Sequence, residues 1–323
     1  MVQYKRNKTK MTITKFLEIV IFFAAFVAVA ASCSSSAERR VADTAQSHYF
    51  PSEVVGNIND AEIDESSGLI ASKCQPNVFW THNDSGDDAF IYALDRTGKK
   101  LGTWAVTDAR NIDWEDIAGY KDRVGKCFIY IGEIGDNDAK RAEHTIYRVA
   151  EPRVSPDDAS TSRERPSRTD AAQALKFTYP DGSHDAETLL VEPRTAEIYV
   201  VTKRKSGPAG VYKLGDTFDS DKAATAEKVA DVSMPAVPNG FVTGGDVSPD
   251  GRRVIISDYA AGYEFVLPEG AANFDEIWKQ QPEIVDLGKR RVGESACYSP
   301  DGNTIYASSE GKHPPIFEIR RRP

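Results

Sequence analysis

The sequence predicts an all-β protein built from repeated small sheets, and three observations support this fold class. Beyond residue 50, no long stretch shows the 3.6-residue apolar period of a helix. Short runs rich in β-branched and aromatic residues recur instead, at residues 78–81, 128–131, 197–201, 253–257 and 304–308. Turn sequences precede these runs, and the tetrapeptide SPDG, which favours a tight turn, occurs at both 248–251 and 299–302.

Aligned on these turns, each repeat begins with a short polar motif that leads into its first strand. The five motifs are residues 66–69, 113–116, 184–187, 244–247 and 293–296. Small sheets repeating every 50–70 residues or so are typical of a β-propeller. The sequence therefore predicts a five-bladed β-propeller. A six-bladed ring is the alternative, if residues 155–170, which we interpret as a loop, contain another blade.

The two ends of the repeat region predict how the ring closes. The last repeat ends after its third strand, at residues 315–319, so it lacks a fourth. Residues 53–58, which precede the first repeat, form a β-rich segment that can supply this strand. Pairing the two ends would remove the exposed sheet edges, and we expect the N-terminal strand to close the ring.

The first 32 residues predict an export signal. Five basic residues precede residue 16, and an apolar run of 13 residues follows at 19–31, which is too short to span a bilayer. The run ends at Cys33, and the residues before it resemble a bacterial lipobox, although Ala30 stands where Leu is usual. We expect a signal peptide at 1–32, lipidation of Cys33, a flexible linker at 33–50 and the propeller at 51–323. Ordinary signal cleavage nearby is the alternative.

Composition and cysteine placement restrict the partners and the cross-links. Lys and Arg number 40 against 49 Asp and Glu, and the resulting net charge of −9 argues against a nucleic-acid partner. Export would allow disulfides. Cys74 and Cys127 precede the second strands of adjacent blades, where a disulfide is geometrically credible. Cys297 lies on an inner strand, and we expect it to be buried and free.

Polar loops gather at one end of the predicted ring. The leading motifs bring Ser67, Glu115, Glu187, Asp246 and Glu294 towards one axis. Converging carboxylates repel one another unless they protonate or share a cation. An oxygen-only ligand set suits Ca²⁺. Zinc is not expected, because no cluster of Cys and His residues converges there. The other interpretation is that such acids bond backbone N–H groups and join blades, which we expect for Asp113, Asp116 and Asp185.

Three motifs carry a resemblance to known families. Residues 79–87 (FWTHNDSGD), 113–117 (DWEDI) and 132–137 (GEIGDN) resemble a family of uncharacterised bacterial secreted propellers. More distantly, the motifs around Ser67, Glu115, Glu187 and Glu294 are similar to the five-bladed calcium-activated nucleotidases (apyrases). That resemblance implies one Ca²⁺ held by these residues, with Thr243 as the nearest equivalent in the fourth blade. The same motifs are similar to SdiA-regulated and esterase-like phytase propellers, so they select no substrate.

Two functions and a structural alternative follow. The first is a cell-envelope lipoprotein whose Ca²⁺ site docks an anionic envelope ligand or protein. The second is a Ca²⁺-dependent hydrolase of phosphate esters or anhydrides acting on a phosphorylated small molecule. There the metal would activate water, Lys203 or Arg204 would bind the anion, and His82 or Asp84 would take a proton. The third is a propeller without an ion.

Overall fold

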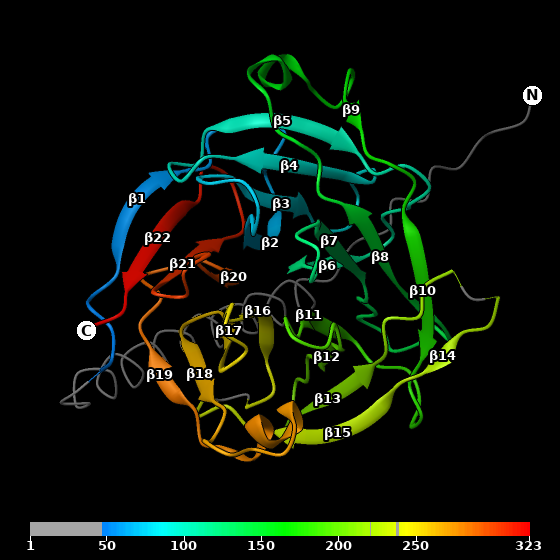
Figure 1. Cartoon of the computed structure of the whole chain (residues 1–323), viewed down its shortest axis with the longest axis vertical. Coiled ribbons are helices and arrows are strands. Elements are labelled where there is room, and N and C mark those ends of the chain that lie inside the picture. The colour runs from blue at the N-terminus through cyan, green and yellow to red at the C-terminus, as the bar shows by residue number, and fades with distance from the viewer. Residues whose placement is uncertain (1–46, 220, 237–238) are drawn as a thin grey trace, which may run out of the picture. The chain divides into compact units, whose positions relative to one another are not determined.

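The computed structural model describes residues 47–219, 221–236 and 239–323. Within this part of the chain, five small antiparallel sheets follow one another around a ring (Figure 1). The structure is therefore a five-bladed β-propeller, as the repeats predict. Its described helices are two short 3-10 turns, η1 (Pro156–Ser160) and η2 (Phe274–Lys279). No helix among these residues is long and apolar enough to cross a membrane.

Each blade places its first strand at the centre of the ring and its last at the outside (Figure 1). Blade one contains β2 (Ser66–Ala71), β3 (Phe79–Asn83), β4 (Phe90–Leu94) and β5 (Lys100–Ala105). Blade two contains β6 (Trp114–Lys121), β7 (Cys127–Glu133), β8 (His144–Ala150) and β10 (Gln173–Thr178). Blade three contains β11 (Ala186–Val191), β12 (Ile198–Thr202), β13 (Ala209–Leu214) and β15 (Glu227–Val232). Blade four contains β16 (Val242–Val247), β17 (Arg253–Asp258), β18 (Gly262–Val266) and β19 (Glu283–Val285).

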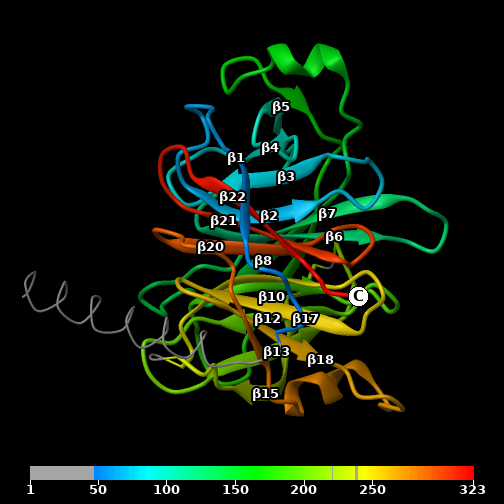
Figure 2. The ribbon, with the colours of Figure 1, turned by 90° about the vertical axis from the view of Figure 1, so that its left-hand side faces the viewer.

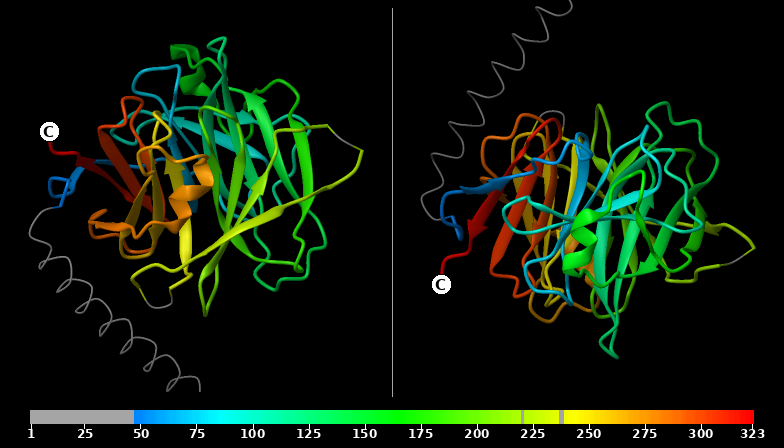
Figure 3. Two further views of the ribbon diagram at one scale, coloured as in Figure 1. Left: turned by 60° about the horizontal axis from the view of Figure 1, so that its bottom comes forward. Right: turned by 90° about the horizontal axis from the view of Figure 1, so that it is seen from above.

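The N-terminal strand closes the ring, as the sequence predicts. Blade five contains β20 (Gly293–Tyr298), β21 (Thr304–Ser309), β22 (Pro315–Arg320) and, from the other end of the chain, β1 (Glu53–Asn57). β1 runs antiparallel to β22, and the two lie side by side in Figures 1 and 3. The contacts begin slightly before residue 51, because Tyr49 is buried and bridges to Arg321. Residues 1–46, which include the expected signal peptide and Cys33, lie outside the described part.

Residues 155–170 form an insertion and no sixth blade. They contain η1 and the two-residue strand β9 (Ser167–Arg168), which pairs in parallel with the outer strand β5. The insertion leaves blade two after β8 and lies along the outer edge of blade one (Figures 1 and 2). A second short strand, β14 (Ala224–Thr225), pairs in the same way with β10. Both additions cover part of an exposed sheet edge.

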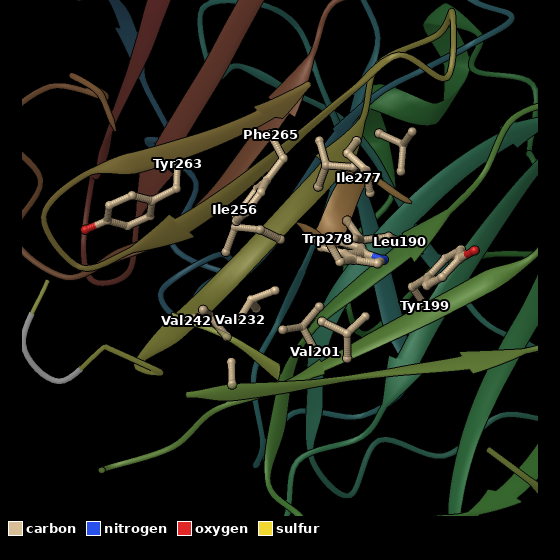
Figure 4. Close-up of a cluster of buried hydrophobic side chains, with 14 of the residues drawn as sticks. Leu190, Tyr199, Val201, Val232, Val242, Ile256, Tyr263, Phe265, Ile277 and Trp278 are labelled. Carbon is tan, nitrogen blue, oxygen red and sulfur yellow. The ribbon is translucent and has the colours of Figure 1, made fainter. Parts of the chain in front are cut away.

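The hydrophobic core is divided into five clusters, and each one lies between two adjacent blades. Figure 4 shows the cluster between blades three and four, where Leu190, Val201, Val242 and Ile256 meet side chains from η2. The β-rich runs of the sequence supply these residues because strand side chains alternate, and each inner sheet buries both of its faces. Packing of neighbouring blades therefore fixes the ring and, with it, the positions of the inner strands.

The repeated turn sequences adopt the same conformation twice. Ser248 and Ser299 each accept a backbone hydrogen bond from the glycine three residues later, at 2.8 Å. Those glycines, Gly251 and Gly302, have φ of 65° and 72°. A residue with a Cβ rarely adopts this left-handed conformation. The turns join the first and second strands of blades four and five, so they set the register of the inner strands.

The disulfide prediction is confirmed. Cys74 and Cys127 are bonded across a separation of 53 residues, and Cys297 is buried and free. The bond joins the β2–β3 loop of blade one to the start of β7 in blade two. It therefore lies at the end of the ring opposite to the polar leading motifs.

Candidate functional site

The first strands of the five blades share one irregularity. In every blade the pairing between the first and second strands shifts register near the start of the first strand, as at a β-bulge. The residues at these shifts are Ser67, Glu115, Glu187, Thr243 and Glu294. A bulge redirects the side chain that it carries. We call this end of the ring, where all five first strands begin, the mouth.

Acidic side chains from adjacent blades meet at the mouth. Oxygens of Glu115, Asp185 and Glu187 lie within 4.8 Å of one another. Oxygens of Asp84, Asp113 and Glu115 form a second such group, so Glu115 belongs to both. Asp84 follows β3 in blade one, Asp113 and Glu115 begin blade two, and the other two acids begin blade three. The ring thus brings together five carboxylates that are up to 103 residues apart.

Burial and mutual repulsion raise the pKa values of these acids. Glu115 is 3% exposed, and desolvation followed by the charges of Glu187 and Asp84 holds its pKa well above the usual range. Desolvation also raises the pKa of Glu187 to about 7 and that of Asp113 to about 6. The pKa of Asp84 is raised for the same first reason. Without a cation, the cluster therefore retains protons near neutral pH.

Glu294 from blade five belongs to the same electrostatic cluster. Its side chain is 6% exposed, and Oε2 has no hydrogen-bond partner among the described residues. Desolvation, and then the charge of Glu187, raises its pKa well above the usual range. A buried carboxylate oxygen without a donor is unfavourable by about 1–3 kcal/mol or more, so a bound proton or a cation would stabilise this position.

One lysine of the protein already reaches the mouth. Lys203 Nζ lies 2.5 Å from Glu187 Oε1, and this ammonium also lies over the rings of Phe241 and Tyr259. The side chain is 12% exposed. Burial alone would lower the pKa of Lys203, but the charge of Glu187 and the hydrogen bond to it raise this pKa overall. Lys203 therefore neutralises part of the acidic cluster. It is bonded to a carboxylate. The hydrolase hypothesis requires a free anion-binding group, and Lys203 is not one.

The two hydroxyl residues of the predicted ligand set connect blades. Ser67 Oγ donates a 2.6 Å hydrogen bond to the carbonyl oxygen of Glu115, and Thr243 Oγ1 donates a 2.8 Å bond to that of Gly293. Each bond runs from one first strand to the next. The hydroxyl oxygens keep lone pairs, so the bonds do not prevent them from acting as ligands.

Asp246 does not join the cluster at the mouth. It lies three residues beyond Thr243 on β16, where its carboxylate accepts the backbone N–H of Val247 at 2.9 Å and that of Tyr298 at 3.0 Å. Lys73 Nζ lies 3.2 Å from the same carboxylate. The sequence predicted Asp246 at the mouth because its motif was aligned with the other polar leading motifs by residue type. The bulge shows instead that Thr243 holds the equivalent position.

The predicted catalytic residues are not arranged as one catalytic set. His82 is fully buried, with Nδ1 2.9 Å from the carbonyl of Asn83, and desolvation lowers its pKa to about 4. Because a carbonyl only accepts, Nδ1 carries the hydrogen, and Nε2 lies inside the protein without a partner among the described residues. Arg204 is exposed and its backbone bridges to Gly240. Only Asp84 and Lys203 lie in or beside the cluster.

The structure agrees in part with the expectation that Asp113, Asp116 and Asp185 bond backbone N–H groups and join blades. Asp116 accepts the backbone N–H groups of Ile117 and, from the next blade, Leu189, both at 2.9 Å. Asp185 accepts one backbone hydrogen bond but is also in the cluster, and Asp113 is there too. A signal for both was present, because Asp-x-Glu occurs at 113–115 and again at 185–187. In both motifs the aspartate stands two residues before the glutamate, immediately ahead of the first strand of its blade.

The GEIGDN motif shapes the mouth without joining the cluster. Glu133 accepts the backbone N–H groups of Ile112 and Asp113, and its Oε1 lies 2.7 Å from Arg141 Nη1. A Cβ at Gly135 would collide with the carboxylates of Glu115 and Asp113. Glycine here leaves the space that these two side chains occupy.

No family model and no curated protein matches this chain.

The donor set fits a hard divalent cation. Oxygens bound to one Ca²⁺ at about 2.3–2.6 Å lie at most about 5 Å apart. The three oxygens of Glu115, Asp185 and Glu187 already meet this condition. All three are carboxylate oxygens, the ligand type that Ca²⁺ prefers, and this group contains none of the Cys or His ligands that are typical of zinc. A bound cation would also compensate the repulsion that raises the pKa values of Glu115 and Glu187.

Proposed function

We propose that this protein is a calcium-binding propeller of the cell envelope that docks an anionic ligand or protein at the mouth. The observation that carries the proposal is the group of Glu115, Asp185 and Glu187, whose oxygens lie within 4.8 Å in a nearly buried site. Glu294, with a buried and unpartnered oxygen, supports it from a third blade. The location rests on the signal peptide and the lipid anchor that the sequence predicts at Cys33.

Coordination chemistry supports an anionic ligand. Ca²⁺ takes six to eight oxygen ligands, and three or four carboxylates leave positions that a ligand's oxygens can fill. The rim of the mouth is partly apolar, with Ile112 62% exposed and Tyr259 38% exposed. An apolar rim around a charged centre is typical of a surface that contacts a partner.

The placement of the polar groups favours binding over hydrolysis. A general base needs access to its substrate and a pKa near the working pH. His82 meets neither condition, because it is fully buried and its pKa is about 4. Lys203 is bonded to Glu187 and Arg204 is exposed outside the cluster. The hydrolase hypothesis therefore keeps only Asp84 of its predicted catalytic groups.

Thermal unfolding of the exported part, residues 34–323, tests the proposal. In Ca²⁺ at 100 times its Kd, the free energy of unfolding should rise by about 2.7 kcal/mol relative to EDTA, a Tm shift of roughly 5 °C. Glu115→Gln and Glu294→Gln should lose this shift. Asp138→Asn, at an exposed acid on the neighbouring β7–β8 loop, should keep it. No shift in the unmodified protein, with no bound metal by elemental analysis, would refute the proposal.

A phosphoesterase screen on the same samples separates the two functions. A binding module should show no turnover of phosphate esters or anhydrides with Ca²⁺ present. Turnover that EDTA abolishes and that Glu115→Gln removes would favour the hydrolase instead.

A further inference from the structure

We infer that the mouth binds two divalent cations, with the carboxylate of Glu115 bridging them. This inference rests on the proposed function and extends it from one ion to a two-ion site. The first ion belongs to the group of Glu115, Asp185 and Glu187. The second belongs to the group of Asp84, Asp113 and Glu115, which no sequence resemblance assigns to a metal.

The geometry provides two overlapping ligand sets. Each set offers three carboxylate oxygens within 4.8 Å of one another, and the sets share one residue. Asp84 of blade one belongs to the second set, whereas Asp185 and Glu187 of blade three belong to the first. Asp113, also in the second set, lies at the start of blade two with Glu115. A carboxylate has two oxygens and can bridge ions about 3.5–4 Å apart, which is the usual spacing in two-metal sites. Glu115 begins blade two, between those blades.

Glu115 itself lacks any cation of the protein. Its side chain is 3% exposed, and its carboxyl shares a hydrogen bond with that of Glu187, another acid of the cluster. Lys203 is paired with Glu187, on the side of the first ion. Arg141, whose charge acts on Asp113, is paired with Glu133. The group around the second ion therefore has carboxylates but no ion-paired cation of its own.

A second, independent observation comes from blade five. Glu294 Oε2 is buried and has no hydrogen-bond partner in the described part of the chain, and its carboxylate interacts electrostatically with Glu187 and Lys203. The site therefore still has an unsatisfied acceptor after its own lysine is counted.

The charge of the mouth also favours two ions. Six carboxylates converge there, namely Asp84, Asp113, Glu115, Asp185, Glu187 and Glu294. With all of them ionised and Lys203 charged, the formal charge is −5. One divalent ion would leave −3 and two would leave −1. Because the repulsion acts between nearly buried groups, the second ion would still relieve much of it.

The arrangement selects a ligand class. Two cations held a few ångströms apart clamp an anion that presents two oxygens to them, and a phosphate group has this shape. We therefore assign phosphate-bearing molecules as the anionic ligands of the proposed binding module. Inorganic phosphate is the simplest probe.

The number of ions bound per chain tests the inference. Equilibrium dialysis against Ca²⁺ with elemental analysis should give two ions for residues 34–323 and for the control Asp138→Asn. Asp113→Asn should lower the number to one, because it removes a ligand of the second ion only. Asp84→Asn tests the same ion from a different blade, in case Asp113→Asn fails to fold. Glu115→Gln, which affects both ions, should lower the number below one at the same free Ca²⁺.

A spectroscopic measurement tests whether the two ions are adjacent. Protein loaded with Mn²⁺ should show an exchange-coupled electron paramagnetic resonance spectrum, and Asp113→Asn should show an isolated Mn²⁺ instead. Phosphate should bind to the doubly loaded protein and at least tenfold more weakly to Asp113→Asn.

The possible failures are distinguishable. One ion in the unmodified protein, unaffected by Asp113→Asn, would overturn the two-ion inference and leave the proposed function intact. Two ions that both persist in Asp113→Asn and Asp84→Asn would place the second ion elsewhere and also overturn it. No ion at all would overturn both proposals. Two ions with unchanged phosphate binding in Asp113→Asn would overturn the ligand class alone.

Discussion

The first strands of the propeller carry buried carboxylates at two levels, and the two levels differ in how their charges are satisfied. At the inner level, Asp116 and Asp246 accept backbone N–H groups from the next blade, and Lys73 adds an ion pair. At the mouth, Glu115 and Glu294 are also buried, but the carboxyl of Glu115 hydrogen-bonds to that of Glu187, and Glu294 Oε2 has no partner among the described residues. All four are buried carboxylates, so their partners separate a structural acid from a candidate ligand.

The comparison teaches why the bulge matters. Beyond the register shift, the backbone of the first strand is close enough to the next blade for an aspartate to reach its N–H groups, as Asp116 reaches Leu189. At the shift, the bulge redirects the side chain, and the carboxylates of Glu115 and Glu187 meet there. The same strand therefore holds the ring together at one residue and contributes a carboxylate to the mouth at the residue before it. Glu115 and Asp116 are neighbours with opposite roles.

The largest effect should come from the end of the ring opposite to the mouth. Replacing Cys74 and Cys127 by serine opens a loop of 53 residues, which should lower the free energy of unfolding by about 4 kcal/mol in the chain-entropy model. Chemical denaturation measures this change. Calcium binding should be unaffected, because neither cysteine is near the cluster. A lost calcium response in the folded variant would show that the two ends are coupled.

The next effect concerns the lysine at the mouth. Lys203→Met leaves Glu187 buried without its ion pair, and in EDTA it should lower the free energy of unfolding by about 3 kcal/mol. The stabilisation by Ca²⁺ should grow, because the ion no longer competes with the ammonium. Lys140→Met, at an exposed lysine on the same side of the ring, is the control. A calcium response that shrinks would mean that Lys203 helps to build the cation site.

Removing an acid of the inner level should destabilise the protein without changing its calcium response. Asp116→Ala leaves the N–H groups of Ile117 and Leu189 buried without an acceptor, which should cost about 2 kcal/mol. Asp116→Asn retains one acceptor oxygen and should cost less. Unfolding curves with and without Ca²⁺ measure both quantities. If Asp116→Asn abolished the calcium shift, the division between the two levels would be wrong.

The smallest effect should be a dependence of stability on pH. The pKa of Glu187 is about 7 in the folded protein and near 4.5 when unfolded, so between these values the folded state binds more protons. In EDTA, stability should therefore fall by about 1 kcal/mol as the pH rises from 6 to 7. The affinity for Ca²⁺ should rise over the same interval, because protons compete for the ligands. Glu187→Gln should flatten both trends. Stability in EDTA that rises with pH would contradict the raised pKa.

The fold was largely predictable because its signals are local and repeated. The β-rich runs, the SPDG turns and the missing fourth strand of the last repeat predict five blades closed by residues 53–58, and the structure confirms each point. The Cys74–Cys127 bond follows from the same alignment, since equivalent loops of adjacent blades lie side by side. Repetition supplies long-range information that a single strand lacks.

The candidate site was predictable only in part. The sequence by itself determined which residues stand at the start of each blade, including Glu115, Glu187 and Glu294, because their motifs recur with the repeat. Only the tertiary structure decided that Asp113 and Asp185 join them, that Lys203 is paired inside the cluster and that Asp246 lies deeper. The physical reason is that a bulge shifts the register by one residue, and partners supplied by the next blade then decide whether a buried charge is satisfied.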